Sequence, residues 1–255
     1  MTPAGVIAPA GYEQLEIGDI TAVARTGAVA GVRAALRVAP TLHAWAATAP
    51  EAQPFTGRDT AWGATLPCGS TQVVVRRSRH GGLLGPLQGD RFLAPGRAPD
   101  ELEIALRLQE AGVRTPDVVA YALYPAGPGL CRIDVATRRL PHGADLPDRW
   151  RLADAAARDA ILTAVALLLR DLQAAGAWHA DLNAKNIYLV EVGRRWQAWA
   201  LDVDRVTFGR PNDPAIGARN LARLARSLRK WRSRHGLAVD EAAIAQLTAL
   251  VQEPS

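Results

Sequence analysis

One polar stretch, residues 178–189, constrains the fold of this chain more than any other. It reads Trp-His-Ala-Asp-Leu-Asn-Ala-Lys-Asn-Ile-Tyr-Leu, so Asp181 stands two positions after His179 and five positions before Asn186. The apolar and β-branched run that begins at Ile187 is typical of a strand. A polar loop that leads directly into a strand in this way is a common place for side chains that carry function.

A second acidic pair follows the next apolar run. Asp202 and Asp204 come directly after residues 199–201, so the order is a polar loop, two strands and then carboxylates. Protein-kinase-like enzymes use this skeleton, H-x-D-x-x-x-x-N with a strand pair and an aspartate, to position a hydroxyl nucleophile and to hold Mg·ATP. Because the loop and its context agree, the pattern favours a phosphotransferase over a chance cluster of polar residues.

Each residue of the skeleton has a chemical reason to be there, since phosphoryl transfer needs positioning and charge neutralisation more than covalent chemistry. We expect Asp181 to be catalytic, accepting the proton of the acceptor hydroxyl and aligning its oxygen. Asn186 offers an amide oxygen and Asp202 a carboxylate, both hard ligands that suit Mg²⁺. We expect His179, in the same catalytic loop, to organise the loop backbone rather than to transfer protons. Asp204 is either a second metal contact or a cap for the following loop.

The charge of the chain narrows the choice of partner. Of its 30 basic residues only Lys185 and Lys230 are lysines. A coding bias toward arginine accounts for most of this, but any phosphate clamp in the first 184 residues must then be an arginine. The net charge of +5 suggests an anionic partner such as a nucleotide, a phospholipid surface or a nucleic acid. Two cysteines do not make a disulfide framework, so a reducing cytosol is the expected compartment.

No secretory or membrane-spanning segment is expected. The first residues lack a basic region ahead of an apolar core. The longest apolar run, residues 160–169, is about half the length that crosses a bilayer and is flanked by charges, so it predicts a buried helix. We expect a protein that is soluble or peripheral to a membrane.

The texture of the chain divides it into three parts. Residues 1–50 show weak periodicity and are interpreted as an N-terminal appendage with some helix around 29–38. Residues 51–140 carry strand patterns and one helix from about residue 98 to Gly112, which predicts a small β-rich N-lobe over the nucleotide. Residues 141–255 predict a larger, mostly helical C-lobe with a connector, one long helix over 150–175 and the catalytic loop. The expected fold is α+β and bilobal, like that of the protein kinases.

Candidate nucleotide contacts lie in the N-lobe. The β-branched run at 71–77 predicts a strand that carries Arg76 and forms a hairpin with the segment beginning at Gly57 and Arg58. The turn at Gly57 and Arg58 is a candidate phosphate cover, although a turn with one glycine is often only a turn. The basic turn 76–82 is either solvated or a contact to phosphate or sugar.

A basic amphipathic helix is predicted near the end of the chain. Residues 205–235 hold nine basic side chains, and Leu221, Leu224, Leu228 and Trp231 recur at helical spacing. The apolar side is expected to pack on the C-lobe. The basic side is either simply solvated or lies against an anionic bilayer. One more amphipathic helix is expected over 240–251.

Residues beyond the skeleton resemble one family. Residues 176–187 are similar to the catalytic loop of the lipopolysaccharide kinases, in particular the Kdo (3-deoxy-D-manno-octulosonic acid) kinases, which reads very nearly G-V-W-H-A-D-L-N-A-H-N-I. Residues 202–205 resemble the family's D-F-D-R, and residues 220–230 its N-L-x-R-L-x-R-S-L-x-K helix. Similar matches extend the resemblance over about residues 55–235: the basic Arg-Gly-Gly-Leu turn near residue 80, the helix and its exit at 97–116, and the strand at 134–141.

The resemblance implies an ATP-dependent kinase at the cytoplasmic face of the bacterial inner membrane. Its acceptor would be the 4-hydroxyl of Kdo on a lipid A precursor, in lipopolysaccharide core biosynthesis, with ATP and Mg²⁺ as cofactors. The anionic membrane surface would be a peripheral partner, with no nucleic acid involved. Arg76 would replace the usual strand lysine and pair with Glu101 rather than Glu103. A register slip of one residue would put Arg77 there instead.

Departures from the family pattern leave the catalytic skeleton intact, so we expect an active enzyme. They are Asp59 for glycine, Gln173 for histidine, Lys185 for histidine and Val203 for phenylalanine.

Three other functions stay open. The skeleton also occurs in heptose kinases and in small-molecule phosphotransferases such as the aminoglycoside and choline kinases. The missing lysine and Asp59 raise a pseudokinase or nucleotide-binding scaffold. The basic helix raises a nucleic-acid binder, which the small number of interleaved aromatic residues disfavours.

Overall fold

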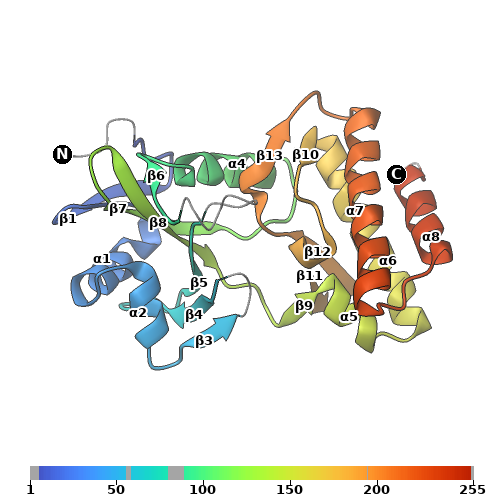
Figure 1. Ribbon diagram of the computed structural model, residues 1–255, viewed down its shortest axis with the longest axis horizontal. Helices are drawn as coiled ribbons and strands as arrows, with labels where there is room; N and C mark the ends of the chain where they lie inside the picture. The colour runs from blue at the N-terminus through green and yellow to red at the C-terminus, as the bar shows by residue number, and fades with distance from the viewer. Residues whose placement is uncertain (1–5, 56–58, 80–88, 194, 254–255) are drawn as a thin grey trace. The chain divides into compact units, whose positions relative to one another are not determined.

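The computed structural model describes residues 6–55, 59–79, 89–193 and 195–253 (Figure 1). The chain forms two compact units. Unit 1 comprises Met1–Leu102 and Asp117–Arg139, and unit 2 comprises Glu103–Pro116 and Leu140–Ser255. Unit 1 is rich in strands and unit 2 is mostly helical, which confirms the predicted α+β class.

Unit 1 is built on an antiparallel sheet. Within its described residues eight strands pair in the order β1-β2-β7-β8-β5-β4-β3, with β6 against β8. The strand predicted at 71–77 is β5, and the family's strand matched at 134–141 begins within β8. The bounds are β1 Tyr12–Ile17, β2 Ile20–Arg25, β3 Gln53–Phe55, β4 Ala61–Thr65, β5 Gln72–Arg77, β6 Phe92–Leu93, β7 Val118–Pro125 and β8 Leu130–Arg138.

Residues 12–48 are part of this sheet and its core, which differs from the appendage predicted over residues 1–50. The hairpin of β1 and β2 pairs with β7 in the sheet. Helices α1 (Val29–Val38) and α2 (Leu42–Thr48) bury Leu36, Leu42 and Trp45 in one core cluster with strand residues such as Val73 and Val75. Burial of such side chains stabilises the unit by roughly 1.5–3 kcal/mol each. The helix predicted at 29–38 is α1.

Helix α4 (Ala98–Glu110) begins in unit 1 and ends in unit 2. Its first turn contains Asp100 and Glu101, which suits the positive end of the helix dipole. The backbone of Gly112 has φ +80°, a left-handed conformation that ends a helix at little cost for glycine. The predicted start and stop signals therefore match the structure.

The long helix predicted over 150–175 is two helices in unit 2. Helix α5 (Leu146–Leu152) ends before α6 (Ala155–Ala174) begins. The side chain of Asp154 accepts a hydrogen bond from the backbone N–H of Ala157 at 2.8 Å, so it starts a new helix as its N-cap. Trp150, buried in α5, donates its indole N–H to the carbonyl of Ala238. This contact fixes α5 separately from α6.

The rest of unit 2 places the polar loop between helices and short strands. Strands β9, β11 and β12 form a sheet in the order β12-β11-β9, and β10 pairs with β13. The run 160–169, predicted to be a buried helix, lies in α6, whose apolar face, including Ile161, Leu169 and Leu172, is buried. The bounds are β9 Gly143–Asp145, β10 Ala177–His179, β11 Ile187–Val192, β12 Arg195–Ala200, β13 Val206–Phe208, α7 Pro214–His235 and α8 Glu241–Gln252.

Candidate active site

In unit 1, Arg76 forms an ion pair with Glu101. Arg76 lies on β5 and donates from Nη2 to Oε1 of Glu101 on α4. Glu101 is only 3% exposed, whereas Glu103 is exposed. A buried carboxylate requires a charged or hydrogen-bonding partner, so the pairing gives Glu101 a role beyond the helix dipole.

Arg77 faces the other side of β5, because successive strand side chains alternate between faces. Its Nη2 lies 3.5 Å from Nδ1 of His43 on α2. The backbone N–H of His43 and the hydroxyl of Tyr124 both donate to Oδ2 of Asp134, at 2.8 and 3.1 Å. Burial raises the pKa of Asp134, against the lowering effect of these hydrogen bonds. Arg77 therefore belongs to a structural polar network, and Arg76 is the arginine beside Glu101.

The predicted phosphate cover is described only in part. Gly57 and Arg58 lie outside the described residues. Asp59, which stands where the family has glycine, forms an ion pair with Nε of Arg79 at 2.7 Å. Asp59 thus anchors the basic segment that follows β5.

In unit 2, a tight turn delivers the catalytic loop. Gly176 follows α6 with φ +65°, and a Cβ there would lie 2.7 Å from the carbonyl oxygen of Gly209. Only glycine fits both the conformation and the space. Strand β10 then pairs with β13, which brings His179 opposite Val206. The loop thus leaves α6 in one fixed direction.

His179 is fully buried and bonded at both ring nitrogens. Nδ1 accepts the backbone N–H of Asp181 at 3.3 Å, so the proton is on Nε2, which donates to the carbonyl of Leu201 at 3.0 Å. Burial lowers the pKa of His179, although the bond to Leu201 and the charge of Asp202 oppose this. A neutral imidazole therefore joins the catalytic loop to the segment that carries Asp202.

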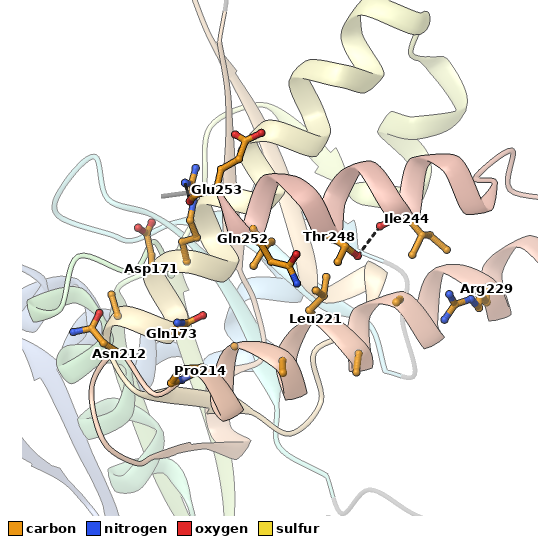
Figure 2. Close-up of a pocket in the computed structure, with 17 residues that line it drawn as sticks. Asp171, Gln173, Asn212, Pro214, Leu221, Arg229, Ile244, Thr248, Gln252 and Glu253 are labelled. Atoms are coloured by element: carbon orange, nitrogen blue, oxygen red, sulfur yellow. Dashed lines mark hydrogen bonds between the residues drawn. The ribbon is translucent and has the colours of Figure 1, made fainter. Parts of the chain in front are cut away.

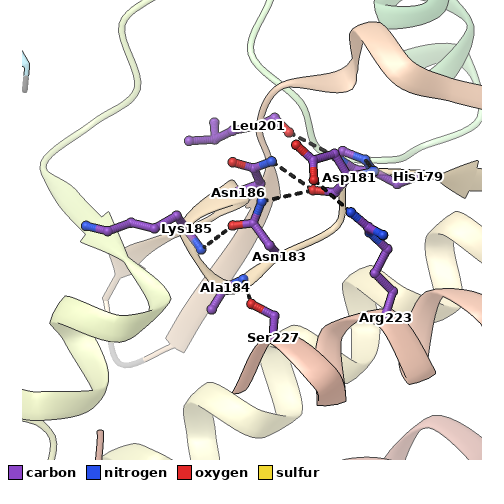
Figure 3. A network of polar contacts seen from close by, with 9 residues as sticks. All are labelled: His179, Asp181, Asn183, Ala184, Lys185, Asn186, Leu201, Arg223 and Ser227. Atoms are coloured by element: carbon purple, nitrogen blue, oxygen red, sulfur yellow. Dashed lines mark hydrogen bonds and ion pairs between the residues drawn. The ribbon is translucent and has the colours of Figure 1, made fainter. Parts of the chain in front are cut away.

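Asp181 presents its carboxylate from the loop and is about one-third exposed. Oδ1 accepts a hydrogen bond from Nη2 of Arg223 on α7 at 2.8 Å (Figure 3). Oδ2 has no hydrogen bond or ion pair to any residue that the structure describes. One oxygen is therefore fixed while the other is open to an acceptor hydroxyl.

Asn186 is held so that its amide oxygen points away from the loop backbone. Its Nδ2 donates to the carbonyl oxygen of Asp181 at 2.9 Å, and Nδ2 of Asn183 donates to the same oxygen at 3.1 Å (Figure 3). Because a carbonyl oxygen only accepts, the amide orientation of Asn186 is fixed by this bond. Its Oδ1 is the atom left for a cation.

Asp202 is exposed and follows β12 in a left-handed backbone conformation, with φ +59° and ψ +49°. This conformation is uncommon for a residue with a side chain, and such residues cluster at functional sites. The neighbouring residue Leu201 is fixed on both sides, since its N–H donates to the carbonyl of Asn186 and its carbonyl accepts from His179. The direction of Asp202 is therefore set by the catalytic loop.

The donor set around Asn186 and Asp202 fits Mg²⁺. Magnesium is commonly held by one or two protein oxygens together with substrate phosphates and water. The described residues contain no group of three or more His, Cys, Asp or Glu that could hold a metal ion. A hard amide oxygen and a carboxylate are suitable for a cation that arrives with a nucleotide.

Three side chains on one face of α7 hold the catalytic loop, and none of them was predicted as a site residue. Asn220 accepts from the N–H of His179 at 3.1 Å and donates to the carbonyl of Ala177 at 2.9 Å. Ser227 accepts from the N–H of Ala184 at 3.0 Å. With Arg223 between them, the spacing i, i+3, i+7 places all three on the same side of the helix. That polar spacing beside an apolar stripe is the signal that could have revealed them.

Two of the family departures have local structural partners. Nζ of Lys185 lies 2.6 Å from Asp145 and 3.5 Å from Asp148. Burial would lower the pKa of Lys185, but these two carboxylates raise it overall. Gln173 packs against Gly217, where a Cβ would lie 2.0 Å from its Oε1. Lys185 thus ties the loop to α5, and Gln173 lies where α6 and α7 pack closely.

A cavity of about 840 Å³ lies in unit 2 (Figure 2). It is lined by α6, α7 and α8, and its α7 residues, among them Ala218, Ala222 and Ala225, are on a different face from Arg223. None of the predicted catalytic or metal-binding residues lines it. We assign it no part in the active site.

Unit 1 is rich in strands and contains an Arg–Glu pair. Unit 2 is mostly helical, and its loop carries an aspartate and an asparagine and is bonded to the segment with a second aspartate. These features define a phosphotransferase of the protein-kinase-like class. Residues 44–249 match the Lipopolysaccharide kinase (Kdo/WaaP) family. The chain belongs to this family, as its catalytic loop predicted, and it is a kinase with a hydroxyl acceptor.

Relatives with assigned activities support the same conclusion. The chain is 30% identical over 193 residues to a 3-deoxy-D-manno-octulosonic acid kinase of Actinobacillus succinogenes, covering 72% of this chain and 78% of that protein. It is 34% identical over 182 residues to a protein of the same name from Xanthomonas campestris pv. campestris, covering 69% and 68%.

A solved structure shares the fold. The structure titled "WaaP in complex with acyl carrier protein" matches with a TM-score of 0.51 and 19% identity, covering 80% of each chain. At this identity the match concerns the fold alone, and it confirms the predicted fold class. No helix in the described part of the chain is both long enough and apolar enough to cross a membrane.

Proposed function

We propose that this kinase transfers the γ-phosphoryl group of ATP to the 4-hydroxyl of Kdo on a lipid A precursor. The relatives named as 3-deoxy-D-manno-octulosonic acid kinases support the choice of acceptor. The observation that carries the chemistry is the Asp181 carboxylate, with Oδ1 held by Arg223 and Oδ2 open. Since the acceptor is a membrane lipid, the proposal includes peripheral attachment at the cytoplasmic side of the inner membrane.

Asp181 acts as the general base in this proposal. Its open oxygen accepts the proton of the acceptor hydroxyl and aligns the nucleophile with the phosphoryl group. His179 positions Asp181 by accepting the backbone N–H of Asp181 at Nδ1. His179 takes no proton, because burial keeps the imidazole neutral. The positioning effect is the larger part of catalysis here, since the attacking and leaving oxygens must be in line.

The remaining residues manage the charge of the nucleotide. Asn186 and Asp202 would hold Mg²⁺, which neutralises phosphate charge when bound. Arg76, oriented by the buried Glu101, supplies a fixed cation for the phosphates in place of lysine. Its planar fork can bind two phosphate oxygens at once. Gly57 and Arg58, which lie outside the described residues, are proposed as the phosphate cover.

The test is transfer of labelled phosphate by the purified protein with Mg·ATP and three acceptors: a Kdo-bearing lipid A precursor, a heptosylated acceptor and a protein. We expect label on Kdo, and phosphorus NMR should place it at the 4-hydroxyl. Asp181→Asn should lower the rate by about 10²–10⁴-fold. Asp159→Asn, a change of an exposed carboxylate on α6, is the matched control and should leave the rate unchanged. Label on heptose or only on protein would contradict the proposal.

A further inference from the structure

The cations of α7 include two that pair with a carboxylate of α8 and others that lie on the side of Arg223. Arg229 and Arg232 both pair with Glu241 of α8, with N–O distances of 2.8 Å. These bonds lower the pKa of Glu241 to about 2. On that side of α7 one carboxylate of the protein therefore partners two arginines.

The cations beside the catalytic loop are not neutralised in this way. Arg226 and Lys230 are exposed, and neither side chain has a hydrogen bond or ion pair to a described residue. The guanidinium of Arg219 stacks on the ring of Trp178 at 3.7 Å and has no carboxylate partner in the described ranges. Stacking leaves the N–H edge of an arginine available to bind an anion. The spacing 219, 223, 226, 230 puts these residues and Arg223 on one side of the helix.

Arg223 is the member of this group that touches the catalytic carboxylate. It uses only Nη2 for Asp181, and its Nε, shielded from solvent, has no acceptor among the described residues. A guanidinium has five N–H donors in a planar fork that matches a carboxylate. Arg223 is thus held in place with most of its binding capacity unused, and its side chain is 37% exposed.

A hydroxyl in position to give its proton to Asp181 must lie within about 3 Å of that carboxylate. In Kdo the carboxylate carbon is four bonds from the 4-oxygen, a separation that Arg223, together with the neighbouring Arg219 and Arg226, can span from beside Asp181. For a neutral sugar the unneutralised cations would contribute little. For a sugar acid they would supply charge-assisted hydrogen bonds and fix the orientation of the ring.

We propose that Arg223, flanked by Arg219 and Arg226, binds the carboxylate of a sugar-acid acceptor and makes the enzyme select acidic over neutral sugars. The inference rests on the proposed function and adds to it the residue that recognises the acceptor. Arg223 bridges the base and the acceptor, so that acceptor binding and alignment of Asp181 occur together.

The test compares two acceptors in non-ionic micelles: the Kdo-bearing lipid A precursor and its derivative with the Kdo carboxylate converted to a carboxamide. For the unmodified enzyme we expect a preference for the acid of about 10–100-fold in kcat/KM. Arg223→Gln should lose most of this preference, and Arg223→Lys should keep part of it. Arg232→Gln, a change on the opposite side of α7, is the matched control and should keep all of it. Removing the lipid phosphates from both acceptors should leave the preference for the acid over the carboxamide unchanged.

Several outcomes would overturn the proposal. An equal loss of rate with both acceptors in Arg223→Gln would mean that Arg223 only positions Asp181. A preference that follows the lipid phosphates would assign these cations to the headgroup, and a defect seen only on anionic vesicles would assign them to the membrane surface. Calorimetric titration of the protein with the free sugar acid, and separately with its amide, measures binding without turnover. It therefore separates this inference from the proposed reaction. Equal binding of acid and amide by the unmodified protein would exclude the proposal whatever the enzyme phosphorylates.

Discussion

The backbone N–H of Leu201 donates to the carbonyl oxygen of Asn186 at 2.8 Å. This single bond closes the β11–β12 hairpin at the point where its two ends carry the proposed metal ligands, Asn186 and Asp202. Because the bond involves only main-chain atoms, either side chain can be changed without losing it. A change at Asp202 therefore tests the metal assignment most directly, whereas a change at Asn186 also removes the bond from its Nδ2 to the carbonyl of Asp181.

Asn186→Ala and Asp202→Asn should each raise the Mg²⁺ concentration needed for half-maximal activity by about tenfold or more. Each change removes a hard oxygen or its charge from the proposed site. Titration of Mg²⁺ at saturating ATP measures the effect, and circular dichroism checks the fold. Asp204→Asn decides the role of Asp204: a shift in the Mg²⁺ requirement means a metal contact, and an unchanged requirement means a structural cap.

Arg76→Ala should raise the KM for ATP by about 10–100-fold, because a charge-assisted contact to phosphate is lost. Arg76→Lys should retain part of the affinity. In a Glu101→Gln background the effect of Arg76→Ala should be smaller, since Glu101 acts by orienting Arg76. Steady-state kinetics with ATP measure all three variants.

The neighbouring arginine is the matched control for that experiment. Arg77→Ala should lower thermal stability, because Arg77 lies beside the network of His43 and Asp134, and it should leave the KM for ATP unchanged. If Arg77→Ala raised the KM and Arg76→Ala did not, the assignment of the phosphate-binding cation to Arg76 would be wrong.

Stability should fall as the pH drops below about 6.5, the ordinary pKa of histidine, because His179 is buried and neutral. Its pKa in the folded state is lowered, chiefly by burial, so below that pH the unfolded chain takes up a proton that the folded chain does not. The loss continues until the pH passes the lowered folded pKa, with a slope of up to about 1.4 kcal/mol per pH unit for this proton. Urea unfolding between pH 7.5 and 5 measures it. His179→Gln should flatten this slope, while His142→Gln, an exposed control, should not.

Asn220→Ala should lower the free energy of unfolding by roughly 1–3 kcal/mol for each backbone group that it leaves without a partner. The two groups are the N–H of His179 and the carbonyl of Ala177, both in buried residues. The rate of phosphate transfer should fall as well, because the loop loses an attachment. Ser233→Ala, an exposed change near the end of α7, should have a negligible effect. A normal loop in Asn220→Ala, seen as unchanged stability and activity, would contradict the role of α7.

Local pattern was sufficient for much of the fold. Strand β5 is marked by β-branched residues, and helix α4 by an acidic first turn and by Gly112 after its end. Each of these signals lies within the element or a few positions from it. The catalytic skeleton was recognisable for the same reason, since its spacing is short. The break between α5 and α6 was missed because Asp154 is compatible with a helix surface, and only its hydrogen bond to Ala157 shows the N-cap.

Long-range contacts account for what sequence could not supply. Strand β1 has the irregular burial pattern of an edge hairpin, with exposed Glu13 and Gln14 next to each other, so it gives no period. Arg223 lies 42 residues from its partner Asp181. In sequence it is one arginine among many on a basic helix, and only the packing of α7 on the loop distinguishes it from Arg229.

The attachment of the catalytic loop to α7 has a consequence for synthesis on the ribosome. Residues 179–186 emerge well before Asn220, Arg223 and Ser227. The nascent chain therefore contains the catalytic loop before it contains the helix residues that hold this loop in place. A chain released before α7 would carry the loop without its geometry. The active conformation therefore forms late in synthesis, only after α7 has been made, although α7 itself performs no chemistry on the phosphate.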